Sequence, residues 1–277
     1  MRTVKMIKDL FSLRAGLAGS VGLVPTMGFL HQGHLSLIER ALAENDHVIV
    51  TIFVNPSQFG PNEDLARYPR DLEADLQKIG GLGDCIVWLP EADEMYPGDF
   101  QTWVNVENLT APLEGAIRPG HFRGVTTIVA KLFNATQPNR AYFGQKDIQQ
   151  VTVISQMVKD LNYPIGIVVC PTVREADGLA MSSRNAYLTP QQRAAAPVIY
   201  RSLRLAEAAF AAGERDAAAL LGLVEKTISA EPLAMIQYVA CTDRTTLQAV
   251  AGLEGSAVIS LAVHVGSTRL IDNIILG

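Results

Sequence analysis

The chain has 277 residues, of which 48% are hydrophobic and 18% are charged. This composition is typical of a globular protein of one or two domains with enough apolar residues for a sizeable core. The formal net charge of −5, without a basic cluster, argues against nucleic acid as the main partner, although a local pocket can still bind a small anion.

The cysteines and the N-terminus indicate the compartment. Three scattered cysteines, Cys85, Cys170 and Cys241, favour a reducing compartment over a disulfide framework. Charged residues interrupt the N-terminus, so its apolar spacing predicts a helix over 3–15 rather than a signal peptide. The longest strand-like apolar runs, such as 48–54, are too short to cross a bilayer. We therefore expect a cytoplasmic protein that has no membrane partner.

The most informative stretch is VGLVPTMGFLHQGHLSLI, residues 21–38. It begins with an apolar run that predicts a buried strand, followed by a Pro-Thr-Met-Gly turn and by the apolar spacing of a helix that begins near Gln32. His31 and His34 would lie together at the N-terminus of this helix, where backbone N–H groups and the helix dipole favour an anion such as phosphate. Gly33 would let such a ligand approach the backbone closely.

The two histidines have three interpretations. In nucleotidyl transfer, imidazoles would donate to nucleotide phosphates and stabilise charge in the transition state. A zinc site is weakly supported, because no third or fourth ligand lies nearby at metal-site spacing. Two ordinary surface histidines are the simplest alternative, but the preceding strand and turn favour the first interpretation.

Polar residues also follow the next predicted strand, residues 47–54. In open α/β sheets, ligands bind beyond the carboxyl ends of the strands, so this loop and the histidine loop could face one crevice. The side-chain amides of Asn55 and Gln58 suit a small polar substrate, although a plain Asn-Pro turn is equally compatible with the sequence. Further strands are predicted over 85–89, 102–106, 140–143 and 165–170, and helices over 125–136 and from about 147 to 160.

Two charged segments remain ambiguous at this level. Residues 61–80 include Asp71 and Asp75, four apart on a predicted helix, which we interpret as a solvated face; a magnesium role is less favoured. In EGAIRPGHFRG, residues 114–124, Arg118 and His121 belong either to a mobile basic loop over an anionic substrate or to a surface turn.

Two later loops have the composition of phosphate contacts. In Gly-Gln-Lys-Asp, Lys146 could meet triphosphate oxygens as a point charge, and Asp147 could cap the next helix or contact a ribose. Gln150 falls on the same side of that helix. In Met-Ser-Ser-Arg-Asn, residues 181–185, hydroxyls, an arginine and backbone N–H groups could bind phosphate, although a surface loop is equally compatible.

The C-terminal part has a different pattern. Alanine-rich helices are predicted over 190–212 and 214–230, and strands over 235–240, 257–265 and 270–275. Strands with such short connections suggest a small antiparallel sheet with helices. We therefore expect an α/β protein with a parallel-sheet domain first, a domain boundary near residue 175, and the serine loop bridging the two domains.

The motif PTMGFLHQGH resembles the His-x-Gly-His motif of the nucleotidylyltransferase superfamily, and its full form resembles the pantothenate synthetase (pantoate–β-alanine ligase) family. The motifs VNPSQF, YPRD, RPGHFRGV, GQKDIQQ and MSSRN follow in the family order and extend the resemblance over residues 25–185. It implies a Rossmann-like nucleotide- and pantoate-binding domain over 1–174 and a smaller α+β domain over 175–277 that covers the active site.

The resemblance also implies the reaction. ATP would adenylate the carboxylate of (R)-pantoate, and the amine of β-alanine would attack pantoyl adenylate to give pantothenate and AMP. Magnesium would arrive with ATP, without a tightly bound cofactor or a predicted protein ligand for the metal, and a homodimer is expected. The alternatives are another adenylyltransferase of the superfamily, acting on a phosphorylated cofactor precursor, and a non-catalytic nucleotide-binding regulator.

Functional residues are carried over by position. His34 would be the proton donor, His31 would lie beside it on the phosphates, and Lys146 would offset phosphate charge during adenylation. Gln145 departs from the glutamate usual in the family, which weakens any role for a charge there. The implied ATP site comprises Met27, Gly28, Phe29, Leu30, His31, Gln32, Gly33, His34, Gly144, Gln145, Lys146, Asp147, Val173, Met181, Ser182, Ser183 and Arg184. The implied pantoate and β-alanine site comprises Gln58, Gln150, Asn55 and an apolar wall of Met27, Val125 and Phe143.

Overall fold

The computed structural model describes residues 1–277, which divide into two compact units. The first unit contains Met1–Gly144 and Gln150–Pro171, and the second contains Gln145–Gln149 and Thr172–Gly277. The chain thus contributes a five-residue segment to the second unit before it returns to complete the first. The roles assigned above to residues 1–174 and 175–277 stay predictions.

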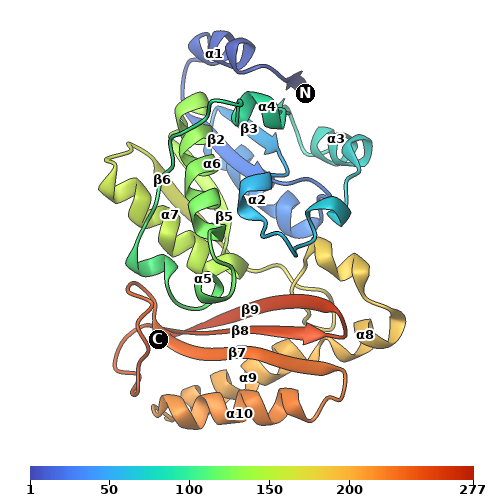
Figure 1. The fold of residues 1–277 in the computed structure, drawn as a ribbon, viewed down its shortest axis with the longest axis vertical. Helices are drawn as coiled ribbons and strands as arrows, with labels where there is room; N and C mark the ends of the chain where they lie inside the picture. The colour runs from blue at the N-terminus through green and yellow to red at the C-terminus, as the bar shows by residue number, and fades with distance from the viewer. The chain divides into compact units, whose positions relative to one another are not determined.

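The first unit is built on a six-stranded parallel sheet, which confirms the predicted fold class (Figure 1). In spatial order its strands are β1 (Arg2–Val4), β4 (Ile86–Trp88), β3 (His47–Ile52), β2 (Val21–Thr26), β5 (Arg140–Gly144) and β6 (Gly166–Cys170). Its helices are α1 (Ile7–Ala15), α2 (Gln32–Glu44), α3 (Leu72–Gly80), α4 (Ala92–Met95), α5 (Glu114–Ile117), α6 (His121–Thr136) and α7 (Ile148–Asp160), the last of which begins in the second unit.

Alternating side chains on the central strands bury both faces of this sheet. Successive residues of a strand point to opposite faces, so each central strand contributes to two apolar clusters. Residues that cluster with α2 are Val24, Val48, Val50 and Tyr142. Residues that cluster with α6 are Val21, Leu23, Ile49, Ala141 and Phe143. Burial on both faces explains why these strands read as continuous apolar runs in the sequence.

The sheet changes its direction of growth at β2. The chain proceeds from β2 to β3 and β4 on one side, and β5 and β6 are added on the other. β2 pairs with β3 through six residue pairs but with β5 through only two, both near the start of β5. In open α/β sheets, ligands bind beyond the carboxyl ends of the strands at such a reversal. The Pro-Thr-Met-Gly turn leaves β2 at this place.

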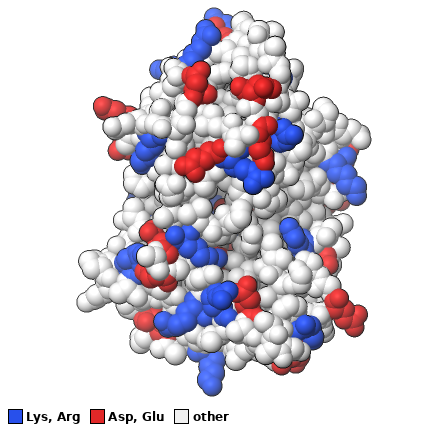
Figure 2. Space-filling model, turned by 180° about the vertical axis from the view of Figure 1, so that it is seen from behind, with Lys and Arg blue, Asp and Glu red and all other residues white.

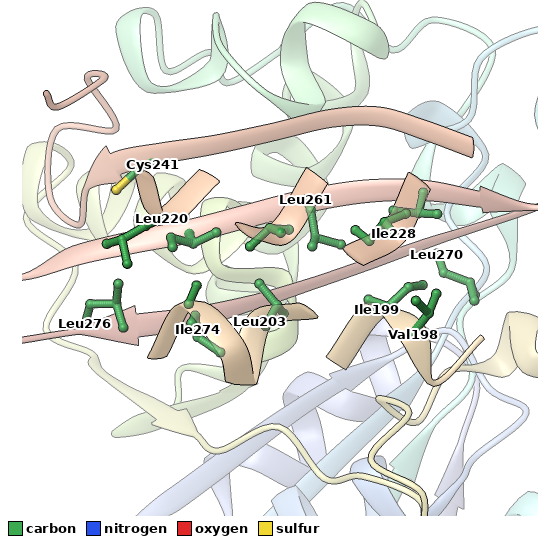
Figure 3. Close-up of a cluster of buried hydrophobic side chains, with 14 of the residues drawn as sticks. Val198, Ile199, Leu203, Leu220, Ile228, Cys241, Leu261, Leu270, Ile274 and Leu276 are labelled. Atoms are coloured by element: carbon green, nitrogen blue, oxygen red, sulfur yellow. The ribbon is translucent and has the colours of Figure 1, made fainter. Parts of the chain in front are cut away.

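The second unit is a three-stranded antiparallel sheet covered by helices. Its strands are β7 (Ala234–Asp243), β8 (Ala257–Val265) and β9 (Thr268–Leu276), with β8 in the centre. Its helices are α8 (Pro190–Ala195), α9 (Val198–Ala211) and α10 (Ala217–Ser229). Figure 3 shows apolar side chains of α9 and α10 meeting those of the strands, which form one continuous core. Leu203 and Leu261 are fully buried in it.

Several boundaries differ from the sequence prediction for identifiable reasons. The expected helix over 3–15 is shorter, because residues 2–4 extend the sheet edge instead, where Leu89 N–H donates to Val4 C=O at 2.8 Å. Residues 102–106 are not a strand; the hydroxyls of Thr126 and Thr127 on α6 bond the backbone of Val104. The expected helix over 190–212 is two helices, interrupted at Pro197, whose ring nitrogen cannot donate.

Two further observations concern exposure. The strand predicted over 165–170 is confirmed as β6, but its apolar run, which is typical of a buried strand, lies at the sheet edge, and only Cys170 at its end is buried. All three cysteines are buried free thiols, and burial raises the pKa of Cys85 to about 11.

Basic and acidic side chains are intermixed on the face shown in Figure 2. None of the helices combines the length and apolar character that a membrane span requires.

Candidate functional site

The turn after β2 needs an unusual backbone. Gly28 and Phe29 both have positive φ angles, 83° and 51°. A Cβ at Gly28 would lie 3.0 Å from Cγ2 of Ile52 and 3.2 Å from Oδ2 of Asp75, so both its conformation and its surroundings favour glycine. The chain is thereby redirected from the strand end into α2.

Asp75, on α3, holds this turn in place. Its side chain is 1% exposed, and its two carboxylate oxygens accept the N–H groups of Phe29 and Leu30, each at 2.7 Å. Lys78, one turn further along α3, donates to Leu30 C=O at 2.7 Å. A buried carboxylate is costly unless it accepts hydrogen bonds in this way.

The prediction of a solvated acidic face is therefore wrong for Asp75. Asp71 is exposed, as expected, and its carboxylate caps α3 by accepting Ala74 N–H at 3.1 Å. The signal that could have separated the two is spacing, because Asp75 lies four residues before the buried Ile79 and therefore on the apolar face of the helix.

His31 and His34 lie together at the N-terminus of α2, as the sequence predicted, and the structure adds that they cap it. His31 is the N-cap residue, and its Nδ1 accepts Gly33 N–H at 3.2 Å. Nδ1 of His34 accepts His31 N–H at 3.3 Å, so the two residues form a reciprocal capping box, with ring centroids 4.0 Å apart. Backbone donors at both Nδ1 atoms assign the proton of each neutral ring to Nε2. Each imidazole therefore carries its N–H donor on the side away from the capped backbone.

The Asn55–Gln58 loop after β3 is tied to the turn after β2. Asn55 is 1% exposed; its amide donates to Gln58 Oε1 at 3.0 Å and to Gly124 C=O at 3.2 Å. Its Oδ1 accepts from Ser57 at 2.9 Å and from Tyr96 at 2.8 Å. These bonds leave Gln58 with its Nε2 directed toward the sulfur of Met27, at 3.2 Å. The structure thus brings Met27, Asn55 and Gln58 together.

Arg118 follows α5 and His121 begins α6, and the two side chains form a partly buried network with Glu63 and the backbone of Gln58. Arg118 makes a bidentate ion pair with Glu63, with both N···O distances 2.7 Å. An arginine can only donate, so His121 Nε2 accepts from Arg118 at 3.1 Å, and His121 Nδ1–H donates to Gln58 C=O at 2.9 Å. Burial, assisted by the Arg118 charge, lowers the pKa of His121 to about 4. Glu114 also faces this network, 4.0 Å from Arg118.

In the second unit, Asn273 of β9 holds the turn that carries Lys146. Its amide donates to the C=O groups of both Gln145 and Lys146 at 2.9 Å, and Gln145 Nε2 donates to Asn273 Oδ1 at 3.4 Å. The Gly-Gln-Lys-Asp segment forms a single 3₁₀ turn, Gln145–Asp147, in which all three residues are partly exposed.

The serine loop begins with a tight hairpin. Met181 N–H donates to Val173 C=O at 3.0 Å, and Arg174 bridges to Ala180 across the same hairpin. Ser182 then caps the 3₁₀ helix Ser183–Tyr187 by accepting Arg184 N–H at 3.3 Å. The structure therefore brings together Val173, Met181 and the Ser182–Arg184 segment, and their binding of phosphate stays a prediction.

The remaining predicted residues occupy different environments. Val125 and Phe143 are 2% and 5% exposed and belong to the core cluster of the first unit. Gln150 lies in the first turn of α7 and is partly exposed. The side chains contain no group of three or more His, Cys, Asp or Glu residues arranged to hold a metal ion. The histidine pair is therefore not part of such a cluster.

Comparisons with known proteins match this chain to one family over its whole length. A family model described as pantoate-beta-alanine ligase matches residues 1–275. The pantothenate synthetases of Roseiflexus sp. (strain RS-1) and Moorella thermoacetica are 57% and 55% identical to it over 276 residues, covering 100% of this chain and 99% and 98% of theirs.

Solved structures give the same result. A pantothenate synthetase from Thermus thermophilus is 48% identical, with a TM-score of 0.95 and 99% coverage of both chains. A pantoate-beta-alanine ligase from Francisella tularensis, complexed with beta-gamma ATP and beta-alanine, is 38% identical, with a TM-score of 0.82 and coverage of 99% of this chain and 97% of that one.

The Asp75 contacts predict a local loss of structure on substitution. Asp75→Ala leaves two backbone N–H groups without their acceptor, so we expect the free energy of unfolding to fall by about 2–5 kcal/mol. Hydrogen exchange should accelerate at the amides of Phe29 and Leu30. The control Asp71→Ala removes only a helix cap, at a cost of about 1 kcal/mol, and should leave those two amides protected. Unchanged protection in Asp75→Ala would contradict the assignment.

His121 predicts a pH dependence of stability. Its pKa is about 4 in the folded chain and 6.5 for an unperturbed histidine, so the unfolded state binds more protons between these pH values. Stability should therefore fall as pH decreases from 6.5 to 4, by on the order of 3 kcal/mol from this residue. Both tryptophans, Trp88 and Trp103, lie in the first unit, so their fluorescence in urea reports its unfolding. His121→Asn should flatten this dependence, and an equally steep fall would refute the prediction.

Proposed function

The chain belongs to the pantoate–β-alanine ligase family, and from this premise we propose how its residues divide the reaction. The activity is the ATP-dependent condensation of (R)-pantoate with β-alanine to give pantothenate, AMP and pyrophosphate. None of the relatives named above is an adenylyltransferase for a phosphorylated precursor or a non-catalytic regulator. The detailed roles below are our proposal.

The observation that carries the proposal is the histidine capping box. Both Nδ1 atoms accept backbone N–H groups, so both Nε2 atoms carry protons and act as donors at the positive end of a helix. Donors held in this way stabilise negative charge that develops on phosphoryl oxygens without reorganising during the reaction. We assign His34 and His31 to the phosphates of ATP, with His34 as the proton donor. Met27 to Leu30, Gln32 and Gly33 complete this part of the ATP site.

The second unit supplies a different kind of charge stabilisation. Lys146 is a compact cation on a turn that Asn273 fixes, and we assign it to offset phosphate charge during adenylation. Ser182, Ser183 and Arg184 offer hydroxyls, a guanidinium and backbone N–H groups for the same anion. Other proposed ATP contacts of this chain are Gly144, Gln145, Asp147, Val173 and Met181.

Gln58 is the proposed contact for pantoate and β-alanine, and Gln150 the second contact for pantoate. Asn55 uses both amide hydrogens and accepts two hydrogen bonds, so we now propose that it positions Gln58 rather than binding substrate itself. Met27, in contact with Gln58, would form with Val125 and Phe143 the apolar wall for the gem-dimethyl group of pantoate.

The two-step order has a physical reason. A carboxylate is a poor electrophile toward an amine, and transfer of AMP to pantoate gives it a good leaving group. The pantoyl adenylate must then be protected from water until β-alanine attacks, which favours a site lined by the apolar side chains named above. The chain's own residues bind the phosphates, orient the carboxylate and hold a proton at His34.

Magnesium and the oligomeric state are inferred from the resemblance, and the location from the cysteines and the charged N-terminus. Magnesium would enter bound to the phosphates of ATP, as part of the substrate. A homodimer in the cytoplasm is expected, and light scattering of the purified chain measures its mass directly. A monomer mass at assay concentrations would contradict the dimer.

The reaction is tested with ATP, magnesium, pantoate and β-alanine, added separately and together. AMP release should require both pantoate and β-alanine, whereas exchange of labelled pyrophosphate into ATP should require pantoate alone. No reaction with pantoate, but transfer of AMP to a phosphorylated acceptor, would leave only the superfamily assignment.

His34→Ala tests the residue that carries the proposal. We expect pantoate-dependent pyrophosphate exchange to fall by about 10²–10³-fold, the usual effect of removing one donor to a developing anion. The control His47→Ala changes a histidine at the start of β3, in the same unit and remote from the capping box. Near-native exchange in a folded His34→Ala chain would refute the role of His34.

A further inference from the structure

Two neighbouring polar residues lie buried in the otherwise apolar strand β9. Asp272 and Asn273 are 3% and 1% exposed, between leucine and isoleucine residues on both sides in the sequence. Burying an amide and a carboxylate costs free energy unless both are hydrogen-bonded. Their side chains bond to loops outside the sheet, which suggests that they serve those loops rather than the sheet itself.

Asn273 binds the turn that carries Lys146. One amide group donates to two consecutive C=O groups, of Gln145 and Lys146, both at 2.9 Å. Two donors on one rigid plane fix both the position and the orientation of these peptide groups. Asn273 of β9 thereby sets the backbone position from which the ammonium group of Lys146 would extend to the phosphates.

Asp272 binds the hairpin that leads into the serine loop. Its carboxylate accepts two hydrogen bonds from Arg174, at 2.6 and 3.0 Å, and Arg174 also donates to Gly178 C=O at 3.2 Å. The guanidinium lies over the ring of Tyr200 on α9, 3.7 Å from its centroid. Bidentate pairing and stacking together restrict the arginine to one arrangement.

Because successive residues of a strand point to opposite faces, one dipeptide binds two loops on different sides of the same strand. We infer that Asp272 and Asn273 are positioning residues that fix the Lys146 turn and the 173–184 loop relative to each other, and so set the geometry with which this chain stabilises the phosphates of ATP. This inference rests on the proposed roles of Lys146 and the serine loop in adenylation.

Gln145 takes part in this arrangement. Its Nε2 donates to Asn273 Oδ1, at 3.4 Å, which a glutamate could not do in its ionised form. A carboxylate placed there would face the amide oxygen without a hydrogen between them. Gln145 in this chain is therefore a partner of Asn273, which gives its side-chain amide a physical role.

Asn273→Ala tests the inference in the full chain. Losing both hydrogen bonds to the turn should raise the KM for ATP in pantoate-dependent pyrophosphate exchange, or lower its kcat, by at least about tenfold. The KM for pantoate should change less than twofold. The rate at which β-alanine consumes preformed pantoyl adenylate should also be retained.

Ser260→Ala is the matched control. Ser260 is the register partner of Asn273 on β8, is also buried, and its hydroxyl has no hydrogen-bond partner. Its substitution should leave all kinetic constants near those of the wild type. Asn273→Ser and Gln145→Glu are milder variants, which keep the test open if Asn273→Ala does not fold; each should shift the same ATP constants in the same direction by less.

A purely structural role makes a different prediction. If Asn273 only stabilises the unit, the folded variants will keep wild-type constants for ATP, or the ATP and pantoate constants will change equally; either result overturns the inference. Failure of the inference is distinguished from failure of the proposed function by two measurements on the wild-type chain, namely pantoate-dependent pyrophosphate exchange and calorimetric binding of ATP. A wild-type chain without pantoate-dependent exchange would refute the function itself.

Discussion

The buried carboxylate of Asp75 is the contact on which the arrangement of the first unit's histidines depends. The turn between β2 and α2 has two consecutive residues with positive φ, a conformation that the local sequence alone does not stabilise. Asp75 accepts the N–H groups of Phe29 and Leu30, so the turn keeps its shape and α2 begins where His31 and His34 can cap it. Without the hydrogen bonds to Asp75, the Nε2–H groups of His31 and His34 would no longer be held in a fixed orientation.

The same physical device recurs at other loops. Asn55 saturates its hydrogen bonds to hold Gln58, His121 holds the backbone of Gln58, and Asn273 holds the turn of Lys146. In each case a buried polar side chain binds a short 3₁₀ turn that follows a strand of the parallel sheet. Such a group is costly if left unpaired, so it favours one loop conformation over others and limits reorganisation when a substrate binds.

Sequence patterns predicted the parts of the fold that depend on local order. The apolar runs of β2, β3 and β5, and the helix that begins at Gln32, follow from burial periodicity and capping. The hydrogen-bond partners of Asp75, His121 and Asn273 could not be found in this way, because they lie 45, 63 and 128 residues away in the sequence. The sequence around Asp75 contains other acidic residues, and it gives no sign of the two backbone N–H groups from which this carboxylate accepts hydrogen bonds.

The discontinuous second unit has a consequence for synthesis. The Lys146 turn leaves the ribosome long before β9, yet the amide that fixes it belongs to Asn273, near the end of the described chain. A nascent chain can therefore complete the parallel sheet while this turn still lacks its partner. We expect this turn to reach its final geometry only after β9 has emerged and paired with β8, so that incomplete chains would adenylate more slowly than the full chain.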